Sequence, residues 1–231
     1  MNLSSCLMNL GLTSNEATIY QTLSAHGEMT GYECAKLTGI SRSNVYIALA
    51  GLCEKGGAFI ADGAVQRYCP APVREFCTNK RREFESAAAY LLANMPSPAA
   101  PSAAYITISG ATAILDKMHN MIAACAERVY ISAEPDVMRL VSDELTEVVS
   151  RGLKVVVLTD PGFVLDGTKQ YSLSRKDGQI RLIVDSRFVL TGDIAETSAC
   201  SCLFSSSDTL VSLFKDSMKN EIRLIELGEL K

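Results

Sequence analysis

The stretch MTGYECAKLTGISRSNVYIALAGLCEKGGAFIADGAVQRYCPAP, residues 29–72, carries the most specific pattern in the chain. Thr30 is a preferred N-cap residue for a short helix, and Gly39 suits the left-handed residue that ends one. Beyond Ser41, apolar residues recur at helical spacing, which predicts another helix. Two β-compatible runs then flank Asp62–Gly63, a dipeptide that favours a tight two-residue hairpin. The stretch therefore predicts helix, turn, helix and hairpin.

Upstream, Thr13 or Ser14 followed by Glu16 marks the start of a preceding helix over residues 14–25. Three helices followed by a β-hairpin form a winged helix-turn-helix, whose second motif helix enters the major groove of DNA. The predicted buried stripe of that recognition helix contains Val45, Ala48, Leu49 and Leu52. The N-terminal part of the chain is therefore expected to bind double-stranded DNA.

The exposed start of the recognition helix offers hydroxyl, amide, guanidinium and phenol groups, all of which hydrogen-bond to phosphates or base edges. An ordinary solvated helix start carries similar residues, so the order of elements is what favours DNA. Arg67 lies on the return strand of the hairpin, and Thr30 suits either phosphate contact or capping. The candidate DNA-binding residues are Thr30, Tyr32, Ser41, Arg42, Ser43, Asn44, Tyr46 and Arg67.

A longer helix is predicted from Val73 to Asn94, because its apolar residues fall on one stripe opposite a charged face. The stripe contains Phe76, Phe84, Ala87 and Leu91. The helix pattern stops at a proline-rich stretch, residues 95–102, which marks a domain boundary. A second copy of the chain is the simplest partner for this stripe, since paired DNA half-sites match a two-fold symmetric dimer.

From residue 103 the sequence alternates β-compatible and helical patterns, with helices predicted over residues 111–126 and 136–151. Strands separated by such helices are typical of parallel β-α-β units. After LKVVVLTD a Gly-containing loop is expected. IRLIVD and FVLTGDI, on either side of Ser186, then predict an antiparallel pair, and a last helix is expected over 207–220. The expected fold class is therefore α/β and multi-domain, with a mixed C-terminal sheet.

Open α/β sheets bind ligands at the carboxyl ends of their strands. The loops that begin there contain the candidate effector-binding residues Ser109, Gly110, Ser132, Glu134 and Asp160. The two acidic side chains would accept hydrogen bonds from ligand hydroxyls, although acidic residues after strands also cap the next helix.

The composition limits the other possibilities. The 231 residues suit one large or two ordinary domains, at about 100 to 200 residues per domain. No stretch reaches about 18 uncharged apolar residues, and no basic segment precedes an apolar start, so we expect a cytoplasmic protein without a membrane segment. The net charge of −4 is unusual for a nucleic-acid-binding protein, so any basic face is expected to be local.

The eight cysteines include no CxxC pair, and with two histidines, His26 and His119, they form no zinc pattern. No metal or cofactor is therefore expected, and most thiols are expected to be reduced and buried. Cys200 and Cys202 form a C-x-C that would face one side of a strand. Soft-metal binding or oxidation is the alternative to simple burial there.

Residues 29–72 resemble the winged-helix domain of TrmB-type transcriptional regulators. GATAILDKMHNMIAACAERVYISAEPD and VSRGLKVVVLTD are similar to the first half of the phospholipase-D-like effector domain of that family. The resemblance implies a DNA-binding domain over 1–72, a linker and dimerisation helix with a hinge over 73–102, and an effector-sensing domain over 103–231. It also implies a homodimer that binds an operator, with an affinity that a small molecule, often a sugar, changes.

Phospholipase-D-like folds also include phosphodiesterases that use an H-x-K-x-x-x-x-D motif. In this chain Gly178, Ile180 and Asp185 occupy the histidine, lysine and aspartate positions, so we expect no enzyme activity. A further alternative is a protein-interaction adaptor that keeps the winged helix without using it on DNA. Salt-sensitive DNA binding distinguishes the regulator from this adaptor.

Overall fold

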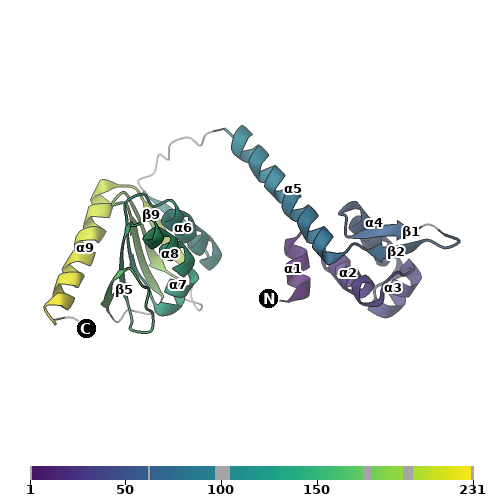
Figure 1. The fold of residues 1–231 in the computed structure, drawn as a ribbon, viewed down its shortest axis with the longest axis horizontal. Coiled ribbons are helices and arrows are strands. Elements are labelled where there is room, and N and C mark those ends of the chain that lie inside the picture. The colour runs from purple at the N-terminus through teal and green to yellow at the C-terminus, as the bar shows by residue number, and fades with distance from the viewer. Residues whose placement is uncertain (1, 62, 97–104, 174–177, 195–199, 230–231) are drawn as a thin grey trace. The chain divides into compact units, whose positions relative to one another are not determined.

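Figure 1 shows the computed structural model of the protein, which describes every residue except 1, 62, 97–104, 174–177, 195–199 and 230–231. The chain divides into two compact units, Met1–Pro98 and Ala99–Lys231. The first is built from helices and a small hairpin, and the second from helices around a mixed sheet. The predicted α/β fold class is confirmed.

The N-terminal unit follows the predicted order of helices and hairpin. Its elements are α1 (Leu3–Asn9), α2 (Ser14–His26), α3 (Gly31–Thr38), α4 (Arg42–Glu54), β1 (Ala58–Ala61), β2 (Arg67–Pro70) and α5 (Val73–Asn94). Thr13 starts α2 and Thr30 starts α3 through capping boxes, and Gly39 ends α3 in the left-handed conformation with φ 72°. The short helix α1, which buries only Leu7 among its own residues, was not predicted.

The core of this unit contains the predicted stripe of α4. Val45, Ala48, Leu49 and Leu52 are at most 4% exposed, and they pack with the buried residues of α2. The helix α3 buries only Gly31 and Cys34, and Leu37 is 55% exposed. The side of α4 opposite its buried stripe does not pack in the core and is exposed to solvent.

The predicted two-residue hairpin turn at Asp62–Gly63 is wrong. The last pair of the ladder joins Ala61 to Arg67, and the described residues 63–66 belong to neither strand, whereas Asp62 lies outside the described residues. A tertiary contact sets this register: Tyr68 is buried and exchanges backbone hydrogen bonds with Met29, at 3.1 and 2.7 Å. The start of β2 is thus held by the chain before α3 rather than by the local turn.

The helix α5 spans the predicted residues Val73–Asn94. Phe76 is its buried residue and packs on Tyr20 with ring centroids 5.4 Å apart. The rest of the helix exposes large apolar side chains: Val73, Phe84, Tyr90, Leu91 and Leu92. Most of the predicted proline-rich hinge, residues 95–102, lies outside the described residues.

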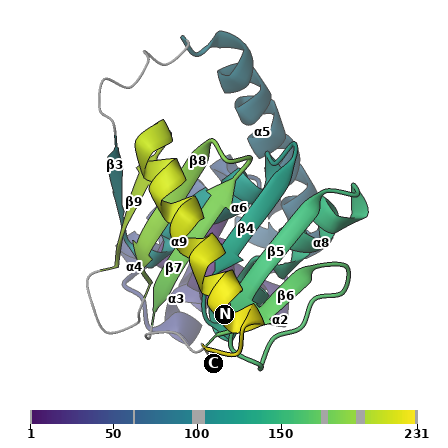
Figure 2. The same cartoon turned by 90° about the vertical axis from the view of Figure 1, so that its left-hand side faces the viewer.

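The C-terminal unit is a mixed sheet with helices on both faces (Figure 2). Its elements are β3 (Ile106–Ser109), α6 (Ala111–Ala123), β4 (Arg128–Ser132), α7 (Pro135–Leu140), α8 (Ser142–Ser150), β5 (Lys154–Thr159), β6 (Lys169–Ser172), β7 (Gln179–Val184), β8 (Phe188–Asp193), β9 (Ser201–Ser205) and α9 (Asp208–Glu226). The strand order is β3-β9-β8-β7-β4-β5-β6, with β4, β5 and β6 parallel and the other neighbours antiparallel. The helices α6, α7 and α8 share one core with the sheet, and α9 packs in a second core on the other face.

The parallel β4–β5 unit and the antiparallel β7–β8 pair are confirmed, but three local expectations for this unit are wrong. The strand β3 pairs with β9 at the sheet edge rather than beside β4, since a β-α-β pattern sets strand direction but not strand neighbours. The predicted helix over 136–151 is two helices that meet at Val141, and β6 occupies what was expected to be loop. Within the described residues, no helix is both long and apolar enough to span a bilayer.

Candidate nucleic-acid interface

The side of α4 that faces away from the core carries four of the eight predicted DNA-binding residues. Arg42, Ser43, Asn44 and Tyr46 are all exposed, because the buried stripe of the helix lies on its opposite side. Ile47 lies among them with 71% of its surface exposed. Sequence reasoning left Ile47 out of the site, although its place off the apolar stripe was the available signal.

Two aromatic contacts hold the start of this face in place. The Arg42 guanidinium lies over the Tyr32 ring, 4.6 Å from the ring centroid. The Tyr46 ring packs on Gly31, where an added Cβ would lie 2.6 Å from the ring. Gly31 therefore permits a close approach of α3 and α4 that any other residue would obstruct. The structure brings Tyr32, Arg42 and Tyr46 together.

The N-terminus of α4 differs from those of α2 and α3. Ser41 makes no side-chain cap hydrogen bond, and its hydroxyl lies 3.3 Å from the hydroxyl of Ser43. The first backbone N–H groups of a helix without a cap are available to an anion, and the helix dipole favours negative charge there. Ser41, Ser43 and the adjacent N–H groups can thus contact a phosphate.

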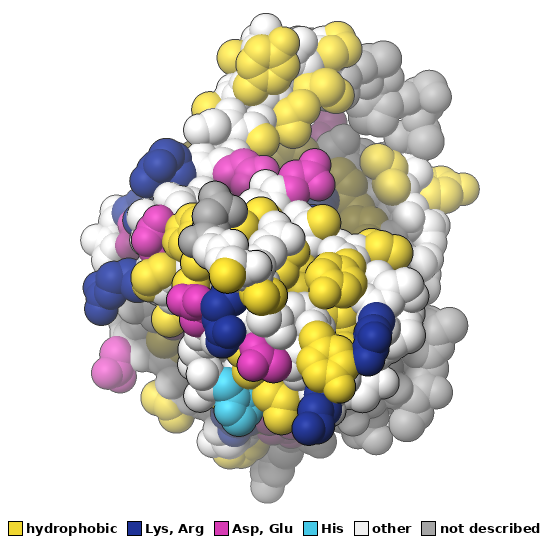
Figure 3. Space-filling view, turned by 90° about the vertical axis from the view of Figure 1, so that its right-hand side faces the viewer, with side chains coloured by type: hydrophobic (Ala, Val, Ile, Leu, Met, Phe, Trp, Pro, Cys, Tyr) yellow, Lys and Arg dark blue, Asp and Glu magenta, His cyan; other side chains and the backbone are white. Residues whose placement is uncertain are grey.

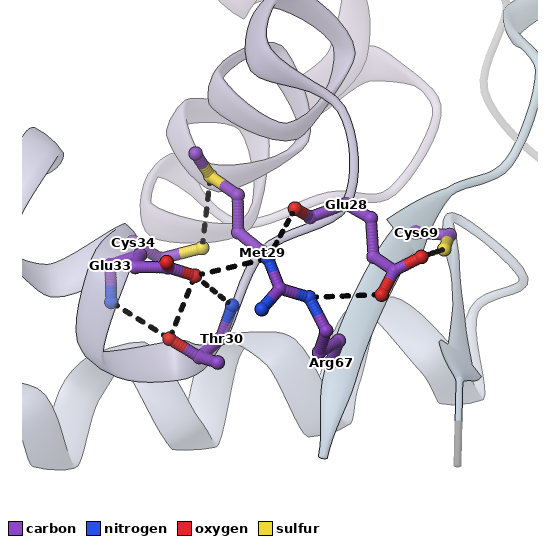
Figure 4. Close-up of polar contacts among 7 residues, drawn as sticks. All are labelled: Glu28, Met29, Thr30, Glu33, Cys34, Arg67 and Cys69. Carbon is purple, nitrogen blue, oxygen red and sulfur yellow. Dashed lines mark hydrogen bonds and ion pairs between the residues drawn. The ribbon is translucent and has the colours of Figure 1, made fainter. Parts of the chain in front are cut away.

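Two predicted DNA-binding residues are instead engaged within the protein (Figure 4). The Thr30 hydroxyl accepts from the N–H of Glu33 at 3.2 Å and donates to its carboxylate at 2.9 Å. The Arg67 guanidinium contacts the carboxylates of Glu28 at 2.9 Å and Glu33 at 3.5 Å. Hydrogen bonds from the N–H and then the hydroxyl of Thr30 lower the pKa of Glu33, so a negative charge occupies the start of α3. A DNA phosphate would compete with these carboxylates for Arg67.

The winged helix-turn-helix, residues 1–72, has few cations for a DNA-binding surface. Residues 1–72 contain four Lys or Arg and five Asp or Glu residues. Among the described residues, ion pairs engage Lys55 and Arg67, whereas none engages Lys36 or Arg42. Figure 3 shows Lys and Arg side chains scattered among hydrophobic and acidic ones on the face in view. If this surface binds DNA, base contacts and helix N–H groups must supply the affinity that a basic patch supplies in other DNA-binding proteins.

The predicted effector residues separate into two groups. Ser132 ends β4, Asp160 directly follows the adjacent parallel strand β5, and Glu134 follows β4. Ser109 and Gly110 end β3, which lies four strand spacings from β4, or about 19 Å. One small ligand cannot bridge the two groups, so at most one of them borders any single ligand site.

The edge formed by β4 and β5 also contains a residue that sequence reasoning missed. Thr159 is 1% exposed, and its hydroxyl has no hydrogen-bond partner among the described residues. The neighbouring polar groups are engaged: Ser132 donates to the carbonyl of Leu158 at 3.2 Å, and Glu134 accepts from the N–H of Gly178 at 2.9 Å. A buried hydroxyl without a partner is costly unless a ligand or water satisfies it.

The three positions of the phosphodiesterase motif have structural roles here. Ile180 is fully buried in the core beneath α6, α7 and α8, and the N–H of Gly178 is held by Glu134. Asp185 lies in the turn between β7 and β8 with φ 53°. Its carboxylate accepts the backbone N–H groups of residues 126, 127 and 128, at 2.9, 2.8 and 3.0 Å. Burial raises the pKa of Asp185, but these donors outweigh it and hold the pKa below its ordinary value.

Replacing Asp185 with Asn is expected to destabilise the protein by about 2 kcal/mol, because an amide NH2 would face a backbone N–H in place of an acceptor. The lowered pKa adds stability above about pH 3.9 that is lost as the pH falls through the folded value. The difference between wild type and variant should therefore shrink below about pH 4. Urea unfolding followed by circular dichroism measures both effects.

The control for Asp185→Asn is Asp166→Asn, a change of the same chemistry at an exposed position, with an expected cost within about 0.5 kcal/mol. Equal stability of the two variants would show that the carboxylate of Asp185 does not hold the start of β4.

The remaining candidate chemistry is weak. Burial, then nearby Asp193, raises the pKa of the Cys202 thiol to about 11, so the thiol is a poor metal ligand or redox group. In the part of the chain that the structure describes, no three His, Cys, Asp or Glu side chains gather as metal ligands. His119 joins α6 to α8, with its Nδ1 atom 2.7 Å from Glu144.

Comparison with known proteins gives matches for both units. Residues 7–74 match the family described as "Sugar-specific transcriptional regulator TrmB", and residues 104–218 match the N-terminal subdomain of the TrmB EBD. The Bacillus subtilis (strain 168) protein YrhO is 27% identical over 203 residues, which is 86% of this chain and 73% of that protein.

Among solved structures, TrmBL2, an archaeal chromatin protein with "a novel mode of DNA binding", has a TM-score of 0.49 and 17% identity, with 94% of this chain and 96% of that chain covered. NucT from Helicobacter pylori has a TM-score of 0.41 and 16% identity over 52% of this chain and 95% of that chain. The two matched family regions cover the helix-turn-helix and most of the C-terminal unit, and the chain therefore belongs to the TrmB family of transcriptional regulators.

Proposed function

We propose that this protein is a transcriptional regulator that binds an operator through the exposed side of α4. The observation that carries the proposal is the arrangement of Arg42 over Tyr32 at the uncapped start of an exposed recognition helix. Arg42 is positioned for a guanine edge or a phosphate, and Ser43 and Asn44 offer hydrogen bonds beside it. Thr30 and Arg67 serve the fold of the unit first and are not part of the proposed contact set.

We infer that the protein is not an enzyme. A phosphodiesterase of the phospholipase-D type needs a histidine nucleophile and a lysine, and Gly178 and Ile180 stand at those positions. The remaining aspartate, Asp185, is engaged by backbone N–H groups. A nucleophile, its activating partner and a charge stabiliser would all have to come from elsewhere.

The protein is proposed to act as a homodimer through α5. Cys77, Phe84 and Leu91 lie seven residues apart along this helix, which is the spacing of a coiled-coil seam. A groove of about 700 Å³ runs beside this stripe, between residues 9–11 and α5, with Phe84 and Ala87 in its lining. A second α5 would cover the stripe and pair two recognition helices with two half-sites.

A small-molecule effector is proposed to bind at the edge formed by β4 and β5. The buried hydroxyl of Thr159, which has no partner within the described part of the chain, and the adjacent carboxylate of Asp160 suit a ligand with hydroxyl groups. Sugars are the first class to test, since the matched family is described as sugar-specific. Ser132 and Glu134 border this edge, whereas Ser109 and Gly110 do not.

Fluorescence anisotropy tests this function. The protein is titrated against the DNA upstream of its own gene and against a scrambled duplex, and both titrations are repeated over a series of salt concentrations. Among the described residues, no ion pair engages Lys36 or Arg42 of the helix-turn-helix, so a dimer with four such cations should show a slope of log K against log salt of about −3.6. Affinity would then fall about 150-fold between 50 and 200 mM salt.

Several outcomes would contradict the proposal. No binding to either duplex at low salt would favour the alternative function, a protein-interaction adaptor that does not bind DNA. This adaptor is the second candidate because the winged helix-turn-helix has few cations. A slope steeper than about −8 would contradict an interface with two cations per subunit. Sugars added to the same complex should shift the titration, and a panel without effect would contradict the proposed effector class.

A further inference from the structure

The outward face of α4 combines one large apolar side chain with small and amide side chains. Ser43, Ile47 and Ala50 are spaced at four and three residues, so they lie on one line along the helix, with Asn44 beside them. All four are exposed. Ile47, at 71% exposure, is the most exposed large hydrophobic residue of α2, α3 and α4.

Packing within the protein does not explain why an isoleucine stands at position 47. The core contacts of α4 come from Val45, Ala48, Leu49 and Leu52, and Ile47 is absent from the residues packed on that core. On the proposed recognition helix, an isoleucine exposed to this degree is available to contact an apolar group of the bound DNA.

The major groove offers one apolar group, the C5 methyl of thymine. Apolar side chains distinguish thymine from cytosine by this methyl, and an asparagine reads adenine through its N6 and N7 atoms. Ala50 and Ser43 are small, so they let the helix approach the base edges on both sides of Ile47. Asn44 lies one turn before Ile47, close enough to contact a base pair beside the thymine.

The small number of cations on the helix-turn-helix makes base contacts more important for its affinity for DNA. With Lys36 and Arg42 as the unpaired cations of the described helix-turn-helix, few phosphate contacts are available to supply sequence-independent affinity. A larger share of the affinity must then come from base edges.

We propose that the operator half-site contains two adjacent A·T base pairs, with the thymine methyl of one packed on Ile47 and the adenine of the other read by Asn44. This inference rests on the proposed function, and it adds the base class that the recognition helix selects. Arg42 would contact a guanine or a phosphate at the end of the same half-site.

The test begins with selection of tight-binding duplexes from a random pool by the full-length chain. Each thymine of the enriched half-site is then replaced singly by deoxyuridine, which lacks only the C5 methyl. At one position the wild-type Kd should rise about four-fold per half-site, the size expected for one buried methyl. Ile47→Ala should weaken binding to the thymine duplex and show no further response to deoxyuridine at that position.

A matched control is Leu37→Ala, which removes another exposed aliphatic side chain, from α3. This variant should keep the full response to deoxyuridine. Circular dichroism should show unchanged helix content in both variants, since both side chains are exposed.

Enriched half-sites without a fixed thymine, or an equal deoxyuridine response in wild type and Ile47→Ala, would overturn the inference while leaving DNA binding intact. Absence of any enriched duplex would overturn the proposed function, and the inference with it. The two failures are therefore distinguishable.

Discussion

Replacement of Leu91 by Glu should convert the protein to a monomer and lower its affinity for a two-half-site operator by about 100-fold or more. Leu91 is 54% exposed and lies on the α5 stripe with Phe84, so the change costs the isolated unit little. In a dimer the new carboxylate would be buried without a partner, which disfavours the paired state. Loss of pairing makes the second half-site contact a separate binding event.

Sedimentation equilibrium and anisotropy on the same samples measure the two effects of Leu91→Glu. The matched control is Ser86→Glu, because Ser86 lies two residues from Phe84 and hence on the opposite side of α5. It should remain dimeric with near wild-type affinity. A Leu91→Glu dimer of normal mass would exclude the α5 stripe as the interface.

Replacement of Arg42 by Ala should weaken operator binding by about 30-fold or more, since each half-site loses a contact and a dimer loses two. The guanidinium is already held over Tyr32, so little conformational freedom is lost when it meets DNA. The fold should be unaffected, because Arg42 is an exposed residue in the first turn of α4. Anisotropy with the selected operator measures the loss.

Two further variants separate the possible roles of Arg42. Arg42→Lys keeps the charge but loses the planar fork, so an intermediate affinity is expected for a guanine contact and near wild-type affinity for a simple phosphate contact. Lys36→Ala should weaken all duplexes alike and make the salt slope shallower by about one unit per subunit. Unchanged affinity of Arg42→Ala would remove this residue from the interface.

The helices α2, α3 and α4 were predictable because their signals are local. Thr30 with Glu33, Gly39 and the apolar stripe of α4 each act within a few residues, and the structure confirms each of them. The long helix α5 was predictable for the same reason. The loop between β1 and β2 was not, because the distant backbone of Met29 sets the register of β2.

The candidate sites show the same division. Residue identity and helical spacing were enough to place Arg42, Ser43, Asn44 and Tyr46 on an exposed face. The engagement of Arg67 by Glu28 and Glu33 was not visible, because those residues are more than thirty positions away in the sequence. Thr159 was missed because its lack of a hydrogen-bond partner is a property of the folded neighbourhood.

The sequence by itself determined the helix-turn-helix, the long amphipathic helix and the α/β pattern, since periodicity, capping and breaker residues act along the chain. Only the tertiary structure decided which strands are neighbours, which cations are already paired, and which loops share an edge. Those features depend on contacts between residues that are distant in the sequence. The strand β3 pairs with β9 at the edge of the sheet, and this pairing places Ser109 and Gly110 far from Asp160.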